Sequence, residues 1–370
     1  MLFQNSRINT INLINPEKYL TDNLIIKLNT NDNGSITNHL YYCLFLDLFS
    51  SELDSLKFST DLEISPGFCE MTFSFQWFEN NINESEKIAY MLIEKLNIEF
   101  IKTHLLKQGK EYLKTLKLRA YENKKSKFNE IHKFINEFYY KQNTEEIIDK
   151  IDDEMFLFFW NSVSINLYSN VRLAQIKKFK GDCPIYLVDR PLIKQNNETL
   201  VFDKNQDDES NQGLIIGIIS TPIKMGSQEN IVLQIINGLI GRFPYSRLVD
   251  KIREQENLAY YVKSRILNIQ GMILITVNSE YPKEVTKQIQ EEISKLNEIT
   301  IKELELIKKS LIQHHSKNQD NIKNEVNLRN QYILSDPTYF ENYENIINAI
   351  SLINVLDTLK KIKLDLIYRY

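Results

Sequence analysis

The chain has 370 residues, 42% of them hydrophobic and 25% charged, which is the composition of a soluble globular protein with room for two domains of ordinary size. Its 45 basic and 49 acidic side chains give a net charge of -4, so the sequence carries no electrostatic footprint for nucleic acid. No apolar run approaches the length of a membrane span, and the N-terminus lacks the pattern of a signal peptide.

The cysteines indicate the compartment. Only three occur, Cys43, Cys69 and Cys183, far apart in the sequence. This spacing provides neither a disulfide framework nor a CxxC metal motif. A reducing cytoplasm is therefore the expected location, and neither a membrane nor a nucleic acid is expected as a partner.

The predicted elements of the first half begin with a strand and a helix. An apolar run at 23–30 predicts the strand, and a helical pattern follows at 39–56. Residues 58–78 predict a pair of strands joined by a turn at Pro66-Gly67. The remaining predicted elements are helices at 84–101, 104–134 and 154–163, then a closing strand at 170–176.

The second half repeats this order at an offset of roughly 190 to 200 residues, which is far too long for a solenoid period. It begins with a predicted strand at 213–220 and ends with one at 364–370. The elements between them are a helical stretch at 229–255, a strand pair at 257–279, and helices at 281–296, 301–331 and 351–362.

Each half groups its helices after paired strands. This order predicts an α+β fold of two tandem similar halves, each a mostly antiparallel sheet with helices packed on one face. The expected halves span 1–180 and 198–370. The irregular segment 181–197, which contains two prolines, is the expected linker.

The most specific sequence pattern is "NGLIGRFPYSRLVDKIREQENLAYYV" at 237–262. It resembles the stretch LGG..SRLF..IRE..GLAYSV in the C-terminal half of the M16 metallopeptidases, the family of insulinase, pitrilysin and the mitochondrial processing peptidase. Downstream, "ITIKELELIKKSL" at 299–311 resembles another pattern of that family. The resemblance covers most of 198–370, whereas the first half resembles the family only in element order. The matching positions are Ser246, Arg247, Leu248, Ile252, Arg253, Glu254, Leu258, Ala259 and Tyr260.

Peptidases of that family carry the zinc motif HxxEH on the first helix of the first half. This chain has "HLYYC" there, so His39 matches, Tyr42 replaces the catalytic Glu, and Cys43 replaces the second His. Catalytic zinc needs about three protein ligands and an open position, and activation of its water needs a general base. We therefore expect no zinc or other cofactor in this chain, and expect His39 and Cys43 to pack along one helix face.

The other histidines do not replace the missing ligands. The sequence contains no second HxxEH and no HExxH. Adjacent residues of a helix point about 100° apart, so the neighbours His314 and His315 should not share a face. The histidines outside the degenerate motif are His104, His132, His314 and His315.

The resemblance assigns catalytic and substrate-binding roles to Arg253 and Tyr260. In the family, an Arg and a Tyr seven residues apart face the zinc site, bind the substrate backbone and stabilise the developing oxyanion. A guanidinium is always charged and offers several donors, and a phenol adds one more. Donors aimed at a carbonyl oxygen in a closed chamber stabilise its transition state.

Structural roles for the same two residues are open alternatives. Arg253 lies in the last turn of the predicted helix, where it can interact with the helix dipole or pair with Glu254 or Glu256. Tyr260 falls on the more apolar face of the predicted strand, where a core tyrosine would also lie.

Glycine positions near the motif depart from the family. Asn257 stands where Gly is usual, at a helix end that requires the left-handed conformation, and Asn is the next-best residue there. The glycine-rich stretch is reduced to Gly238 and Gly241. These changes affect the expected shape of the substrate groove more than the fold.

A chain with the Arg/Tyr pair and no zinc motif resembles the non-zinc subunit of a heterodimeric M16 peptidase. The expected partner is an HxxEH-bearing M16 subunit that holds the zinc. The expected substrate is an unstructured peptide that is bound by strand addition, such as the precursor of a ribosomally made product. The abundance of Asn, Ile and Lys fits an AT-rich bacterium.

The alternative is a non-catalytic peptide-binding or scaffold protein of the same fold, as in respiratory-complex core subunits. An unrelated hydrolase has no support, because the sequence contains neither GxSxG nor a P-loop.

Overall fold

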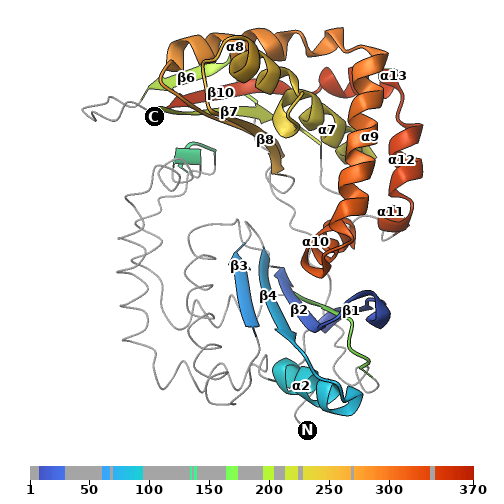
Figure 1. The fold of residues 1–370 in the computed structure, drawn as a ribbon. Helices are drawn as coiled ribbons and strands as arrows, with labels where there is room; N and C mark the ends of the chain where they lie inside the picture. The colour runs from blue at the N-terminus through green and yellow to red at the C-terminus, as the bar shows by residue number, and fades with distance from the viewer. Residues whose placement is uncertain are drawn as a thin grey trace, which may run out of the picture. The chain divides into compact units, whose positions relative to one another are not determined.

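Strand pairing in the computed structural model forms two five-stranded sheets with the same connectivity (Figure 1). Their orders are β1-β5-β2-β4-β3 and β6-β10-β7-β9-β8. In each sheet the first and last strands along the chain pair in parallel, and the other pairs are antiparallel. The structure describes residues 8–29, 61–66, 70–94, 134–135, 137–139, 164–173, 195–203, 213–223, 228–267, 271–333 and 338–370.

The predicted α+β fold of two similar halves is confirmed by this repeated topology. The first sheet contains β1 Ile8–Leu13, β2 Asp22–Asn29, β3 Asp61–Pro66, β4 Glu70–Trp77 and β5 Ser164–Ser169. The second contains β6 Leu200–Asp203, β7 Gly213–Ser220, β8 Tyr261–Leu267, β9 Met272–Ser279 and β10 Lys363–Arg369.

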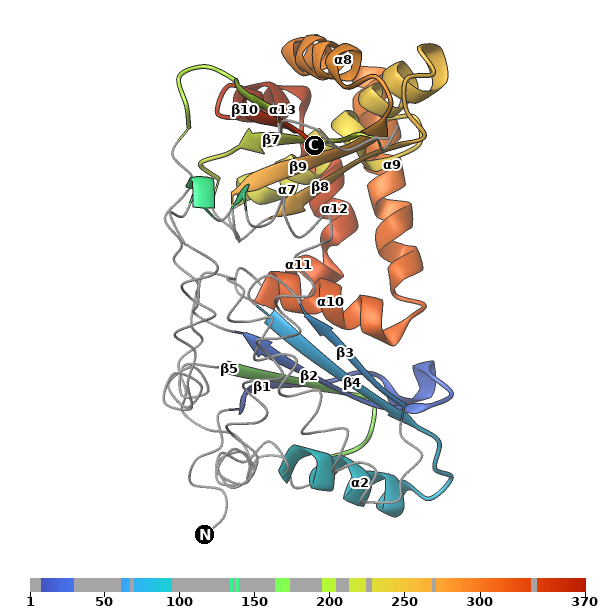
Figure 2. The same ribbon diagram turned by 90° about the vertical axis from the view of Figure 1, so that its left-hand side faces the viewer.

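The first sheet has one apolar and one polar face. Leu24, Phe73 and Phe75 lie on the apolar face and are almost completely buried. Helix α2 (Ile82–Glu94) lies along this face, where the Trp77 indole donates a hydrogen bond of 3.0 Å to Ser85 (Figure 2). Strand alternation places the buried polar side chains of Lys27 in β2 and Asn166 in β5 on the other face.

Helix α10 (Ile322–Ile333) covers that polar face, on the opposite side of the sheet from α2 (Figure 2). The Tyr168 hydroxyl donates to the Asn330 side chain at 3.1 Å. The buried Glu325 carboxylate accepts from Lys18 at 2.6 Å and from Arg329 at 2.8 Å. Polar partners therefore satisfy the polar groups buried under α10.

The docking of α10 decides how the chain divides. One compact unit consists of residues 1–189 with 322–330, and the other of 190–321 with 331–370. The sequence placed all of 198–370 in the second half, so 322–330 differ from that expectation. This segment belongs with the first unit because its buried face contacts β5 and the segment after β1.

In the second unit, helices follow the paired strands. Central strands β7 and β9 are almost completely buried. A capping box at Thr300 starts the long helix α9. None of the helices in the described ranges is long and apolar enough to cross a membrane. The α-helices are α7 Gln228–Asn237, α8 Pro282–Ser294, α9 Ile301–Asn318, α11 Thr338–Glu341, α12 Tyr343–Ala349 and α13 Leu352–Leu359.

Some elements differ from their prediction. The closing strand of the first half is β5 at Ser164–Ser169, not 170–176, because its polar face is buried against other polar groups and hides the usual apolar alternation. The helix predicted at 301–331 divides into α9 and α10. Strands β1 and β6 were not predicted. The helices predicted at 39–56 and 154–163, and nearly all of the one at 104–134, lie outside the described residues.

Candidate functional site

The candidate site is built on a π-helical segment that is followed by strand β8, the last strand in the order of the second sheet. Residues Val249–Gln255 form a π-helical segment, whose buried side chains Val249 and Ile252 anchor it in the second unit. Arg253 points away from this core, and 54% of its side chain is exposed. Its Nε lies 3.4 Å from a carboxylate oxygen of Glu254. π-Helical turns occur frequently at functional sites.

The structure shows which carboxylate pairs with Arg253. Of the two carboxylates considered, Glu254 is the partner, whereas Glu256 pairs with Lys251 at 2.8 Å. Both members of the Arg253–Glu254 pair are more than half exposed, and exposed pairs contribute about 0 to 1 kcal/mol to stability. The stability of the fold therefore gives little reason for an arginine at this position.

The loop after this helix is held by its backbone. Asn257 has a φ of 53°, which confirms the left-handed conformation predicted for it. The Leu258 N–H then donates to the Ile252 carbonyl at 2.8 Å. On the other side of the same residue, the buried Ser279 hydroxyl donates to the Leu258 carbonyl. Both polar groups of the Leu258 backbone are thus satisfied within the second unit.

Tyr260 follows this fixed residue and is 81% exposed. The alternative that Tyr260 is a core tyrosine is therefore wrong. The strand predicted from residue 257 begins only at Tyr261, which pairs with Asn278. The reason is that the bonds of Leu258 to Ile252 and Ser279 hold the preceding residues outside the extended pairing.

The structure brings the Arg253 and Tyr260 segments together at one end of the β8–β9 hairpin. The Ile252–Leu258 hydrogen bond joins a neighbour of Arg253 to a residue two positions before Tyr260. Tyr281, which is also exposed, lies at the same end, because its N–H donates to the Ser279 hydroxyl at 2.8 Å. Sequence patterns did not single out Ser279 or Tyr281, since neither belongs to a recognisable motif.

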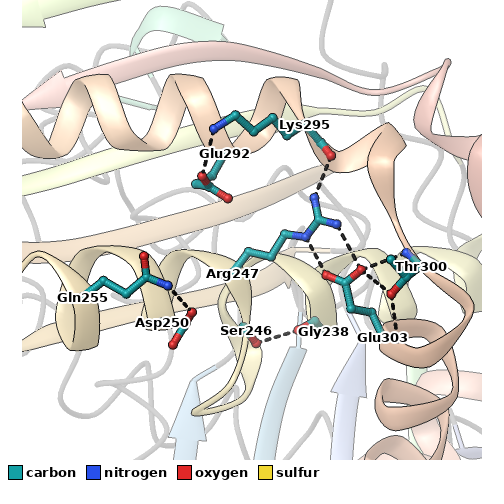
Figure 3. A network of polar contacts seen from close by, with 9 residues as sticks. All are labelled: Gly238, Ser246, Arg247, Asp250, Gln255, Glu292, Lys295, Thr300 and Glu303. Carbon is teal, nitrogen blue, oxygen red and sulfur yellow. Dashed lines mark hydrogen bonds and ion pairs between the residues drawn. The ribbon is translucent and has the colours of Figure 1, made fainter.

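Arg247 braces the helix that carries Arg253 (Figure 3). Its guanidinium donates to both carboxylate oxygens of Glu303, at 2.9 and 3.2 Å, and to the Lys295 carbonyl at 2.6 Å. Glu303 also accepts from the Thr300 N–H and hydroxyl, each at 2.8 Å. Partial burial raises the pKa of the Glu303 carboxyl, but the hydrogen bonds from Arg247 and Thr300 outweigh burial and lower it to about 2. Arg247 therefore has a bracing role.

The two glycines permit close packing on both sides of the same helical stretch. A Cβ added to Gly241 would lie 3.2 Å from the backbone nitrogen of Ser264 on β8. One added to Gly238 would lie 2.6 Å from the Ile307 Cγ2 atom on α9. The Gly238 carbonyl also accepts from the Ser246 hydroxyl at 2.6 Å, as Figure 3 shows. Close packing, not an open groove, is the observed use of these glycines.

The second-half histidines are not a metal site. His315 is buried and stacks on Tyr343 with ring centroids 4.1 Å apart. His314 is exposed, and its Nδ1 lies 3.2 Å from Arg242 and 2.8 Å from Asn318. The expectation that these adjacent side chains diverge is confirmed.

The degenerate zinc motif is not described by the structure. His39, Tyr42 and Cys43 lie outside the described residues, as do His104 and His132. Within the described ranges, no three His, Cys, Asp or Glu side chains gather as metal ligands would. The expected packing of His39 with Cys43 therefore stays a prediction.

Comparison with known proteins shows similarity to one family over part of the chain. Residues 166–311 match the family model described as the peptidase M16 inactive domain. A Bacillus subtilis protein named "Probable inactive metalloprotease YmfF" is 40% identical over 55 residues, which is 15% of this chain and 13% of that protein. The match thus spans a small part of the relative's length. The resemblance predicted from the motif is confirmed.

Solved structures share the fold over nearly the whole chain. A protease from Helicobacter pylori superposes with a TM-score of 0.75 at 13% identity, over 99% of this chain and 97% of that one. The periplasmic protease PqqL from Escherichia coli superposes with a TM-score of 0.60 at 16% identity. That match covers 95% of this chain but only 42% of PqqL, so this chain spans less than half of the longer protein.

Proposed function

Since this chain carries the inactive domain of the M16 peptidase family, we propose that it is the non-zinc subunit of a heterodimeric M16-type peptidase. Its partner is a second M16 chain that bears an intact HxxEH motif and binds the zinc. Arg253 and Tyr260 contribute hydrogen-bond donors to the substrate backbone and to the oxyanion formed during peptide cleavage. The substrate is an unstructured peptide, such as the precursor of a ribosomally made product in a bacterium.

The observation that carries this proposal is the exposure of both donors on a fixed framework. Arg253 and Tyr260 project from a braced helix and an anchored loop, and neither contributes much to the core. Rigid support of exposed donors is what stabilisation of a transition state requires, because donors that must reorganise lose part of their effect.

Two further observations support a paired chain. The residues at the zinc-motif position include one matching ligand, His39, so catalysis by this chain alone lacks a metal and a base. In addition, the fold of this chain corresponds to 42% of the longer protease PqqL, so two chains of this size correspond to most of one such protein. With three widely spaced cysteines, a reducing cytoplasm is the proposed location.

The test is reconstitution with an HxxEH-bearing M16 chain from the same genome. The chain purified alone should hold no stoichiometric zinc and cleave no peptide. Co-expression should produce one peak in size-exclusion chromatography, and peptide cleavage should exceed that of the partner alone. Two separate peaks without any gain in cleavage would count against the heterodimer, and one tightly held zinc per chain with chelator-sensitive cleavage would count against an inactive subunit.

A second candidate is a non-catalytic peptide-binding or scaffold protein with the M16 fold. The descriptions of the matched domain as inactive and of the relative as a probable inactive metalloprotease favour it. The two candidate functions predict different cleavage activity when this chain is mixed with the HxxEH-bearing partner. A scaffold binds a partner or peptide without changing its cleavage, whereas a peptidase subunit is required for cleavage.

A further inference from the structure

The turn at 242–245, which has the sequence RFPY, is attached to helix α9 at two points. The Arg242 guanidinium donates to the Nδ1 atom of His314 at 3.2 Å. The Tyr245 hydroxyl donates to the hydroxyl of Ser310. Ser310 and His314 are four residues apart on α9, so they lie on the same side of the helix. The RFPY turn is therefore held along one side of α9.

Contacts within the RFPY turn join its residues into one unit. The rings of Phe243 and Tyr245 stack with their centroids 5.6 Å apart, and the Arg242 guanidinium lies 5.5 Å from the Phe243 centroid. The turn closes on Ser246, whose N–H donates to the Phe243 carbonyl at 3.0 Å and whose hydroxyl accepts from the Phe243 N–H at 2.8 Å. Ser246 is followed directly by the helical residues that lead to Arg253. The attachment of Arg242 to α9 therefore supports the turn from which that helix begins.

The Nδ1 atom of His314 accepts from two donors. One is the Arg242 guanidinium at 3.2 Å, and the other is the side-chain nitrogen of Asn318 at 2.8 Å. An accepting ring nitrogen carries no proton, so this arrangement requires a neutral imidazole with its proton on Nε2. In the imidazolium form, Nδ1 is itself a donor and would face two other donors. Protonation of His314 is therefore incompatible with the observed contact to Arg242.

The surroundings of His314 also oppose its protonation. Partial loss of hydration around the ring has the largest effect and lowers the pKa of His314 from its ordinary value of 6.5. Arg242, from the π-helical segment Gly238–Arg242, lowers this pKa further, as do His315 and Lys317 of α9. Within the described ranges, no carboxylate is among the groups that act on this ring. His314 is therefore neutral at neutral pH and takes up a proton only below pH 6.5.

We propose that the contact between His314 and Arg242 is a pH-sensitive latch that holds the RFPY turn on α9. Above pH 6.5, the neutral ring accepts from Arg242 and the latch is closed. As the pH falls below this value, the imidazolium repels the guanidinium and the turn loses its attachment through Arg242. This inference goes beyond the proposed function and does not depend on it, because the latch is a property of this chain alone.

The alternative is a histidine that does not control the turn. A hydrogen bond at the surface exchanges readily with water and contributes little to stability. Under that alternative, His314 protonates at its ordinary pKa and the RFPY turn does not respond. The two explanations differ in the pKa of His314 and in the protection of the turn at different pH values.

An NMR titration of the histidine ring C–H signals in the isolated chain tests the first difference. The signal of His314 is identified by its absence from His314→Gln. Its pKa should lie below 6.5, and Arg242→Met, which removes both the donor and the charge, should raise it toward 6.5. Lys283→Met removes an exposed charge on α8 and should leave it unchanged. A wild-type pKa of 6.5 or higher, or an equal pKa in Arg242→Met, would overturn the inference.

Amide hydrogen exchange tests whether protonation releases the turn. Dividing each measured rate by the intrinsic rate at the same pH removes the direct effect of pH on exchange. Protection of the Phe243 and Ser246 amides should fall about three- to tenfold from about pH 7.5 to about pH 5, as expected for the loss of one hydrogen bond. Amides of the buried strand β7 report global stability and should keep their protection.

Two substitutions of His314 supply the matched variants. His314→Gln provides a neutral oxygen acceptor that does not titrate, so it should keep the turn protected at both pH values. His314→Lys places a permanent positive charge beside Arg242 and should leave the turn poorly protected at both pH values. Equal protection of the wild-type turn at both pH values would overturn the inference, as would equal protection in the two variants or a parallel loss of protection in β7.

Discussion

Replacement of the exposed donors should remove activity without destabilising the fold. Tyr260→Phe deletes one hydroxyl from a side chain that is 81% exposed, and Arg253→Ala shortens one that is 54% exposed. Surface substitutions of this kind change the free energy of unfolding by less than about 0.5 kcal/mol. Loss of one oxyanion donor instead raises the activation free energy by about 2.7 to 4 kcal/mol, or roughly 10²- to 10³-fold in kcat.

The assay combines peptide-cleavage kinetics of the reconstituted complex with thermal melts of the same variants. Tyr261→Phe is the matched control, because it removes a hydroxyl from the adjacent exposed tyrosine, which lies within β8. We expect wild-type melting temperatures for all three variants. A large loss of kcat should occur only with Arg253→Ala and Tyr260→Phe.

Two results would refute this reasoning. If Tyr260→Phe retains nearly wild-type kcat/KM, its hydroxyl is not a catalytic donor. If activity falls only in proportion to a lowered melting temperature, as expected for a helix-end charge at Arg253, then the residue stabilises the fold and does not act on substrate.

Three other substitutions test the framework. Glu303→Gln should lower the free energy of unfolding by about 1 kcal/mol at neutral pH, allowing for solvent screening of a side chain that is 34% exposed. The pKa of Glu303 is lowered from 4.5 to about 2, so this stabilisation is present above pH 4.5 and disappears as the pH falls to 2. The melting temperatures of wild type and variant should therefore converge near pH 2. A difference in melting temperature that stays constant with pH would contradict this prediction. Ser279→Ala removes the donor to the Leu258 carbonyl, so it should speed amide exchange in the loop before β8 and lower kcat more than it changes KM. Ser279→Thr keeps a hydroxyl and should retain the wild-type exchange rate and kcat. Unchanged exchange in Ser279→Ala would exclude an anchoring role. Gly238→Ala places a Cβ 2.6 Å from Ile307 Cγ2 and should destabilise by about 1 to 3 kcal/mol, with partial recovery in the double variant with Ile307→Leu; a wild-type melting temperature would show that the packing yields easily.

Several strands could be predicted because their local pattern agrees with their environment. β7 is an almost continuous apolar run and is buried on both faces, so sequence and structure coincide at Gly213–Ser220. β5 could not be located in this way. Its Asn166 and Tyr168 are buried, but their partner Asn330 comes from a helix more than 160 residues later. Nothing near β5 in the sequence indicates that its polar face will be satisfied.

The sequence proposes the residues of the candidate site but not their geometry. The spaced motif selected Arg253 and Tyr260, and the need for a left-handed residue identified Asn257. The motif could not distinguish a core tyrosine from an exposed one. That distinction depends on the anchoring of Leu258 by Ile252 and Ser279, which are brought together only when the helix end meets the β8–β9 hairpin.

The sequence alone determined the repeated α+β pattern, the resemblance of the second half to the M16 family and the missing zinc ligands, because each is a property of residue types at fixed spacings. Tertiary structure decided the exposure of Tyr260, the bracing role of Arg247 and the place of α10 in the first unit. These depend on partners that are distant along the chain, such as Glu303 for Arg247 and Lys18 for Glu325. Local spacing contains no information about such partners, because folding alone brings them within hydrogen-bonding distance.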